Sequence, residues 1–100
     1  MDNIRTQYIC RLFPNGVIRE EQWGYDPINA ENHRGDYEYI VRWHRLDGPA
    51  HIVYNKLGYI TRYKWWVNGE LITSDVLEKY FVDALNPTDE EIFIFKMAKV

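Results

Sequence analysis

The chain has 100 residues, 46% of them hydrophobic and 16% aromatic, and a formal net charge of −3 at pH 7. A chain of this length and composition can bury one core without disulfides or a metal, so we predict a single domain spanning residues 1–100 and exclude disorder, collagen and coiled coil. The single cysteine, Cys10, cannot form an internal disulfide, and no apolar run approaches the roughly 20 residues of a membrane helix. We therefore expect a soluble cytoplasmic protein that holds no cofactor.

The fixed charges separate along the chain. Residues 42–64 contain five basic side chains and one acidic side chain, whereas residues 70–91 contain seven acidic side chains and one lysine. The overall charge is too mild to predict nucleic-acid binding by itself. The basic stripe and the acidic segment either steer a charged partner or face each other within the fold.

The first part of the chain predicts a hairpin and a long loop. Residues 8–13 are apolar and end at Pro14-Asn15-Gly16, in which the Asn-Gly pair is typical of a tight hairpin turn. Residues 17–23 return as the second strand. Residues 24–36 are rich in turn formers, which predicts a loop of about a dozen residues, long enough to serve as a second contact surface.

Four more strands follow. Residues 37–43 alternate as a half-buried strand, a turn at 46–49 leads to a strand at 50–54, and residues 59–67 form the longest strand. A second Asn-Gly turn at 68–69 leads into a short strand at 70–73. The alternation assigns five aromatic residues to the core: Tyr37, Tyr39, Trp43, Tyr63 and Trp65.

The periodicity changes after residue 73. Ser74 is a candidate N-cap, and apolar residues then recur at helical spacing as far as Asn86-Pro87. Thr88 and Glu91 match a capping box that would start a second helix, although residues 92–95 also suit a strand. The predicted fold is therefore α+β: an antiparallel hairpin-built sheet of about six strands in residues 1–73, followed by one or two C-terminal helices in residues 74–100.

The sequence contains a weak internal repeat. Residues 16–23 align with residues 58–65 at an offset of 42 positions, sharing a turn glycine, an isoleucine two residues later and a tryptophan seven residues later. The tryptophan lies on the same strand face as the residue that follows the glycine. We interpret this as one hairpin used twice, with both copies packed into one sheet because neither alone could bury its aromatic face.

A longer motif begins at residue 44. The segment His44-Arg45-Leu46-Asp47-Gly48-Pro49-Ala50, followed by Tyr54, Gly58, Trp65-Trp66 and Asn68-Gly69, has the form HRxDGPA…Y…G…WW.NG. It resembles small repeats found in many phage, giant-virus and some bacterial proteins, which are distantly similar to MORN-type β-hairpin repeats. The resemblance is strongest over residues 45–70. It implies a β-hairpin domain and favours a phage-encoded protein acting on a host factor, but it implies no shared activity.

No catalytic or metal site is predicted. Asp47 lies beside His44 and Arg45, but Asp-Gly-Pro is typical of a turn. The three histidines and Cys10 lack the close pairing of zinc ligands, and alternation suggests that Cys10 is a buried structural thiol. Because the sequence also lacks a phosphate-binding glycine loop, a His-Glu-x-x-His helix and a Gly-x-Ser-x-Gly turn, we predict that the protein is not an enzyme.

A basic and aromatic strand face is the predicted partner-binding surface. Arginine and tryptophan together are typical of interface hot spots. The seven predicted residues come from two strands: Ile40, Arg42, His44, Ile60, Arg62, Lys64 and Trp66. The alternative is that the C-terminal helices cover this face and bury Ile60 and Trp66.

These features favour a non-enzymatic protein-binding protein, specifically a phage-encoded inhibitor that blocks a surface of a bacterial host or defence complex in the host cytoplasm. The alternative is a small nucleic-acid or nucleotide-binding module that uses Arg42, Arg62, Lys64 and Trp66. A third possibility is a homo-oligomer that forms through an open sheet edge.

Overall fold

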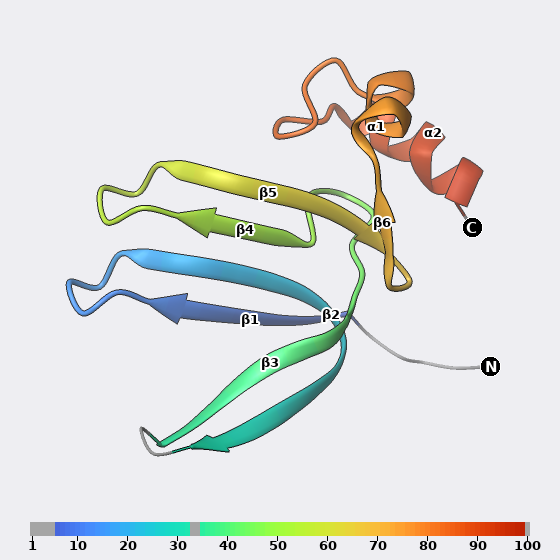
Figure 1. Ribbon diagram of the computed structural model, residues 1–100. Coiled ribbons are helices and arrows are strands. Elements are labelled where there is room, and N and C mark those ends of the chain that lie inside the picture. Colours follow the sequence, from blue (N-terminus) through green and yellow to red (C-terminus); the bar gives the residue numbers. More distant parts are fainter. Residues whose placement is uncertain (1–5, 33–34, 100) are drawn as a thin grey trace.

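The computed structural model describes residues 6–32 and 35–99, and the side chains of these residues except those at 27–38. It confirms the predicted α+β fold of a six-stranded antiparallel sheet followed by two helices (Figure 1). The elements are β1 (Gln7–Leu12), β2 (Ile18–Asn32), β3 (Gly35–Trp43), β4 (His51–Tyr54), β5 (Ile60–Val67), β6 (Glu70–Ile72), α1 (Ser74–Tyr80) and α2 (Asp89–Lys99). Among the described residues, neither helix has the length and apolar character needed to cross a membrane.

Two hairpins, β1–β2 and β4–β5, lie side by side with their turns at the same end of the sheet (Figure 1). They join through antiparallel pairing of β2 with β4, where Glu21 lies opposite Ile52. The strand order is β1-β2-β4-β5-β6, and β3 pairs with the second half of β2. That second half and β3 extend as a separate arm.

The prediction of a loop at residues 24–36 is wrong. β2 continues to Asn32 and pairs with β3 from Gly24 opposite Trp43 to Asn32 opposite Gly35; residues 33–34 lie outside the described part of the chain. Backbone pairing needs no apolar alternation, because the ladder satisfies the N–H and C=O groups whatever the side chains are. The turn formers that suggested a loop are spread along both strands of this arm.

The two hairpins are built alike at positions 42 residues apart. Gly16 and Gly58 both have positive φ angles, +85° and +89°. Their N–H groups donate to the carbonyls of Phe13 and Asn55 at 2.9 and 3.0 Å. Each first strand also has a register shift at the corresponding place, between Arg11 and Leu12 in β1 and between Val53 and Tyr54 in β4.

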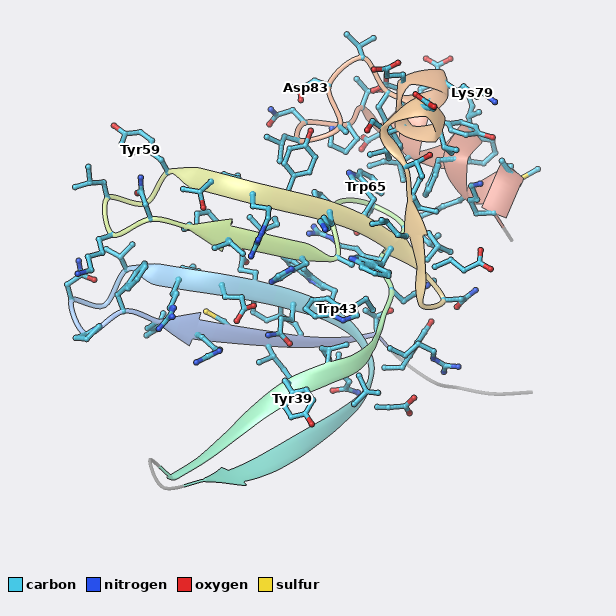
Figure 2. All side chains as sticks on the ribbon, in the orientation of Figure 1. Tyr39, Trp43, Tyr59, Trp65, Lys79 and Asp83 are labelled. Atoms are coloured by element: carbon cyan, nitrogen blue, oxygen red, sulfur yellow. The ribbon has the colours of Figure 1, made fainter. Side chains whose placement is uncertain are left out.

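The main core lies between one end of the sheet and the two helices. Trp65 and Phe95 are fully buried, and Val67 and Phe81 pack with them. The Trp65 ring stacks on Phe81 at 4.7 Å and meets Phe95 edge-on at 5.4 Å. In Figure 2, Trp65 points from β5 toward the helices. The helices thus cover the sheet only near Trp65.

The predicted aromatic core is correct only in part. Trp65 is fully buried, but Trp43 and Tyr39 are half-buried and Tyr63 is 37% exposed. Tyr63 is farther along β5 from the end that the helices cover. The Tyr37 side chain lies outside the described residues.

The first helix is shorter than predicted. Its N-cap is Thr73 rather than Ser74, and it ends at Tyr80 instead of continuing to residue 86. The chain turns there because polar side chains accept the backbone N–H groups. The Glu91 carboxylate accepts the Val82 N–H at 2.9 Å, and Asp83 Oδ1 accepts the Leu85 N–H at 3.0 Å.

The C-terminal segment is a helix, so the strand alternative for residues 92–95 is wrong. Thr88 and Glu91 form the predicted capping box: the Thr88 N–H donates to Glu91 Oε1 at 2.9 Å, and the Glu91 N–H donates to Thr88 Oγ1 at 3.2 Å. Acidic residues in the first turn and lysines in the last turn match the helix dipole. These local signals and the burial of Phe95 together favour the helix over the strand.

Candidate partner-binding face

The pairing of the two hairpins aligns side chains in rows across four strands. One row contains Ile9, Gln22, His51 and Lys64, and a second row contains Arg11, Glu20, Val53 and Arg62. The row between them contains Cys10, Glu21, Ile52 and Tyr63. Successive rows alternate between the two sides of a sheet. We call the side with the first two rows the basic face, and the opposite side, which continues to Trp65 under the helices, the helix face.

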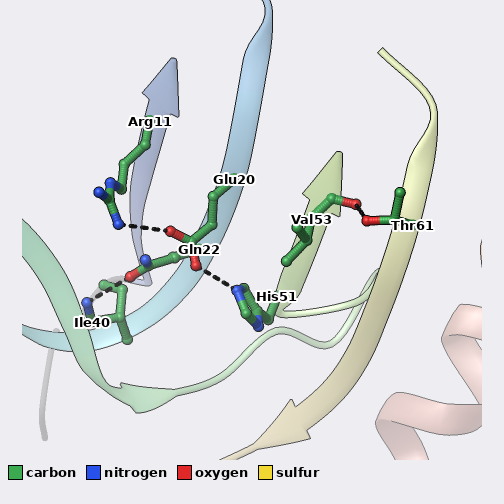
Figure 3. Close-up of polar contacts among 7 residues, drawn as sticks. All are labelled: Arg11, Glu20, Gln22, Ile40, His51, Val53 and Thr61. Carbon is green, nitrogen blue, oxygen red and sulfur yellow. Dashed lines mark hydrogen bonds and ion pairs between the residues drawn. The ribbon is translucent and has the colours of Figure 1, made fainter. Parts of the chain in front are cut away.

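Glu20 lies at the centre of the basic face. Arg11 Nη1 donates to its Oε1 at 3.3 Å, and His51 Nε2 lies 2.6 Å from its Oε2 (Figure 3). The hydrogen bond with His51 lowers the pKa of the Glu20 carboxyl below its usual value, although burial opposes this effect. Glu20 is therefore ionised at neutral pH, and its charge is already matched by its neighbours.

Aromatic rings gather at one end of the basic face. The Trp43 ring lies 4.5 Å from the His51 ring and 6.4 Å from the Trp66 ring, measured between centroids. All three side chains are half-buried. Trp43 comes from β3, so the arm contributes an aromatic residue to the face that the two hairpins form.

The basic face carries two exposed cations on β5. Arg62 and Lys64 are exposed, and neither forms an ion pair within the part of the chain that the structure describes. They lie two residues apart on β5 and share a side with Trp66. Ile60 lies beyond the register shift of this hairpin and is paired with Tyr54, so it does not follow the same alternation. The face therefore presents positive charge beside aromatic surface.

The helices do not cover the basic face. They pack against Trp65 and Val67, whose side chains point to the opposite side of β5. Ile60 is 41% exposed, so the alternative in which the helices bury it is wrong. Trp66 is half-buried, and the ring beside it is Trp43 rather than a helical residue.

Two residues predicted to face outward are instead buried. Ile40 is 2% exposed, and its N–H donates to the side-chain oxygen of buried Gln22 at 2.9 Å. His44 is 7% exposed, and its ring stacks on Tyr25 with centroids 4.9 Å apart. The prediction that Ile40 and His44 form an outward surface is wrong, because Ile40 packs against Gln22 and Gly24 and His44 packs against Tyr25.

Arg42 is exposed, but it lies on the other side of β3 from Trp43. Its guanidinium lies 4.8 Å from the centre of the Tyr25 ring and 3.8 Å from Asp26. Trp43, the next residue along the strand, points to the basic face. The seven predicted residues thus divide. Arg62, Lys64 and Trp66 share the basic face, Ile60 lies beyond the register shift of β5, and the three residues from β3 do not join them.

The motif at residues 44–50 is a folded clamp. Arg45 Nε donates to Asp47 Oδ1 at 2.8 Å, and Arg45 Nη1 donates to the Pro49 carbonyl at 3.1 Å. The guanidinium lies 3.8 Å from the centre of the Trp23 ring. A Cβ on Gly48 would come within 2.7 Å of Arg45 Cζ, so a side chain there would displace the guanidinium from this position. Asp47 is part of a turn, as predicted.

The clamp also joins the two halves of the motif. The Asn68 N–H donates to His44 Nδ1 at 2.9 Å, the Gly69 N–H donates to the Trp43 carbonyl at 2.8 Å, and the Arg45 N–H donates to the Trp66 carbonyl at 3.0 Å. Burial, and secondarily Arg42, lowers the pKa of His44, which keeps Nδ1 free to accept. Most of the residues that carry the resemblance therefore hold one another in place.

Glu21 connects two tyrosines on the helix face. Its carboxylate accepts hydrogen bonds from the hydroxyl groups of Tyr8, at 2.6 Å, and of Tyr54. Burial, together with the hydrogen bond to Glu21, raises the pKa of Tyr54 to about 12. Cys10 shares this face but is exposed, so the prediction of a buried thiol is wrong. It lies on the outer strand, away from the helices.

Trp43, His51, Arg11 and Glu20 belong to the basic face but were missing from the predicted site. The 42-residue repeat could have identified Arg11 and Glu20, because it makes them the equivalents of Val53 and Arg62 in the second hairpin. Trp43 could not be placed by that route, because it belongs to the arm outside the repeat.

Among the described residues, no cluster of three or more His, Cys, Asp or Glu side chains could hold a metal ion. Comparisons with protein-family models, with curated proteins and with solved structures find no match to this chain.

Proposed function

We propose that this protein is a non-enzymatic protein-binding protein and that its basic face covers an acidic surface of its partner. The observation that carries the proposal is the pair of exposed cations, Arg62 and Lys64, beside the half-buried rings of Trp43 and Trp66. Cations beside aromatic surface are typical of interface hot spots. Glu20 is already matched by Arg11 and His51, so the face has a positive excess.

The sheet supports steric occlusion as the mode of action. The backbone of β5 is fixed by pairing with β4 and β6, so the face needs little rearrangement when a partner binds. Inhibition of a bacterial host or defence complex by a phage-encoded protein is the finer form of this proposal, and it depends on the resemblance of residues 44–70.

Nucleic-acid binding is the alternative proposal. It is supported by the shared side of Arg62, Lys64 and Trp66. Two observations favour a protein partner instead. Arg42, the fourth residue predicted for nucleic-acid binding, points to the other side of β3. The Glu20 carboxylate lies in the same row of side chains as Arg62, where it would repel a phosphate.

The test is affinity capture from a bacterial lysate with two matched variants. The variant Arg62→Glu/Lys64→Glu reverses the charge of the face, and Lys56→Glu/Lys79→Glu makes the same change in net charge elsewhere. We expect the tagged wild-type protein and the control to retain one stoichiometric protein after nuclease treatment. We expect the face variant to lose at least about tenfold of the captured partner.

Two outcomes would overturn the proposal. Loss of the captured material with nuclease, and a steep fall in capture as the salt concentration rises, would favour nucleic acid. Equal capture by both charge-reversal variants would show that the basic face is not the binding surface. Circular dichroism of each variant verifies that the fold is unchanged.

A further inference from the structure

Strand β1 leaves one edge of the sheet open. It is the first strand in the order and pairs, among the described residues, only with β2. The direction of its hydrogen bonds follows from Trp23 of β2. The Trp23 N–H donates to the Ala50 carbonyl at 2.9 Å, and the Trp23 carbonyl accepts the His44 N–H at 3.0 Å. The backbone groups of Trp23 therefore point away from β1.

Antiparallel ladders alternate between bonded and non-bonded pairs. Because Tyr8 and Cys10 lie opposite Trp23 and Glu21, they are non-bonded pairs with β2. Ile9 and Arg11 therefore supply the hydrogen bonds to β2. The N–H and C=O groups of Tyr8 and Cys10 point outward along the open edge.

The second hairpin shows how such an edge is filled. Ile52 of β4 is the residue equivalent to Cys10, 42 positions later. Its backbone groups also point away from their own hairpin, and there they pair with Glu21 of β2. The same edge therefore carries an antiparallel strand in one hairpin and none in the other.

Strand β5 of another copy is a poor occupant for this edge. β5 is the equivalent of β2, so addition in the manner of the β2–β4 pairing would place Arg62 opposite Arg11. Directly opposed like charges destabilise a strand pair. This repulsion disfavours an open-ended series of copies.

A second β1 has no such conflict. The strand contains no proline or lysine, and its single charge, Arg11, is paired with Glu20. Tyr8 and Leu12 are 49% and 58% exposed, which leaves apolar surface at both ends of the strand. An antiparallel pair in which Cys10 lies opposite Cys10 of the second strand brings Tyr8 of each strand toward Leu12 of the other.

We propose that β1 pairs antiparallel with β1 of a second copy of this chain, about a two-fold axis close to Cys10. The two sheets then become one continuous sheet, and the two-fold axis is perpendicular to it. Both basic faces lie on the same side of this dimer. The inference goes beyond the proposed function, because it concerns the sheet edge and would hold whatever the basic face binds.

The first test is concentration-dependent amide exchange combined with light scattering on the wild-type protein. In the single chain, the amides of Ile9 and Arg11 are protected by β2, whereas those of Tyr8 and Cys10 exchange freely. When nine in ten chains are paired, exchange at Tyr8 and Cys10 should slow by about tenfold, because only the unpaired chains exchange. The mass should double over the same concentration range.

The second test uses Cys10→Pro with Cys10→Ala as its matched control. Proline removes an N–H that points to the open edge, so it costs no hydrogen bond to β2 but blocks a further strand. We expect Cys10→Ala to dimerise like the wild type and Cys10→Pro to keep the mass of one chain. If the proline variant does not fold, the exchange pattern of the wild-type protein decides.

The proposal is overturned if the wild-type protein keeps the mass of one chain at every concentration, or if it forms assemblies larger than two chains. Dimerisation of folded Cys10→Pro with unchanged affinity would also overturn it. The Arg62→Glu/Lys64→Glu variant separates the two proposals, because it should lose its partner while dimerising as the wild type does.

Discussion

Trp23 and Trp65 occupy equivalent positions in the two hairpins but are covered in different ways. Trp65 is fully buried under Phe81 and Phe95, whereas Trp23 is half-buried beneath the guanidinium of Arg45, 3.8 Å from its ring centre. The C-terminal helices cover the tryptophan of the second hairpin, and the clamp at residues 44–50 covers the tryptophan of the first. The two copies of one pattern therefore have different contributions to stability.

The neighbouring tryptophans of β5 should differ in their contribution to folding. Trp65→Ala should cost about 3–5 kcal/mol, because it leaves a large cavity between sheet and helices. Trp66→Ala should cost about 1–2 kcal/mol, because the side chain is only half-buried. Urea unfolding monitored by circular dichroism measures both. A loss above about 3 kcal/mol for Trp66→Ala would place that side chain in the core and contradict its role on the basic face.

The stability that the clamp provides should depend on arginine at position 45 and not only on a positive charge there. Arg45 bonds the Asp47 carboxylate and the Pro49 carbonyl at once and lies over the Trp23 ring. A lysine cannot make this planar, forked contact, so Arg45→Lys should cost about 1–2 kcal/mol, and Arg45→Ala somewhat more. Chemical denaturation of both variants provides the comparison. Wild-type stability of Arg45→Lys would mean that only charge is needed there.

Much of the sheet could be predicted from the sequence because hairpins are local. Glycine turns and period-two alternation indicated the pairs β1–β2, β4–β5 and β5–β6, and Thr88 with Glu91 indicated the second helix. The β2–β3 arm could not be predicted, because the second half of β2 carries turn formers and lacks alternation, even though most of β3 alternates. The unpredicted pairing of β2 with β3 also explains why the predicted site residues of β3 do not join those of β5. Whether Arg42 and Trp66 share a side depends on how the arm leaves the sheet, which is a long-range property.

Stability should fall as the pH drops below the ordinary pKa of histidine, about 6.5. Burial, with a smaller effect of Arg42, lowers the pKa of His44 in the folded state. The unfolded chain therefore binds the proton first, so the stabilisation from His44 is complete above pH ~6.5 and is lost as the pH falls toward the folded pKa, by at most about 1.4 kcal/mol per pH unit.

The measurement is the free energy of unfolding between about pH 8 and pH 5, compared with His44→Asn. The asparagine oxygen can accept the Asn68 N–H as Nδ1 does but does not titrate. We expect a shallower pH dependence in the variant. The pKa of Glu20 is lowered from 4.5, so its stabilisation is lost only at more acidic pH and does not disturb this window. Identical slopes for both proteins would contradict the prediction.

Among the glycines whose surroundings the structure describes, Gly24 should be the one that least tolerates a side chain. It lies where β2 leaves β4 and begins to pair with β3, and a Cβ there would lie 2.2 Å from the Arg42 carbonyl oxygen and 2.5 Å from Ile40 Cγ2. The first of these atoms is backbone and cannot move without displacing β3. Gly24→Ala should therefore cost about 3 kcal/mol or more.

Gly16→Ala is the matched control, because Gly16 has φ +85° and nothing within 4 Å of the added carbon. It should cost only the backbone strain, about 1–2 kcal/mol. Urea unfolding gives both losses, and amide exchange shows where each arises. In Gly24→Ala the β3 amides should lose protection while those of β5 keep it, because β3 forms its strand ladder with β2 and, among the described residues, none with β5. Equal losses in the two variants, or unchanged exchange in β3, would show that the arm accommodates the methyl group.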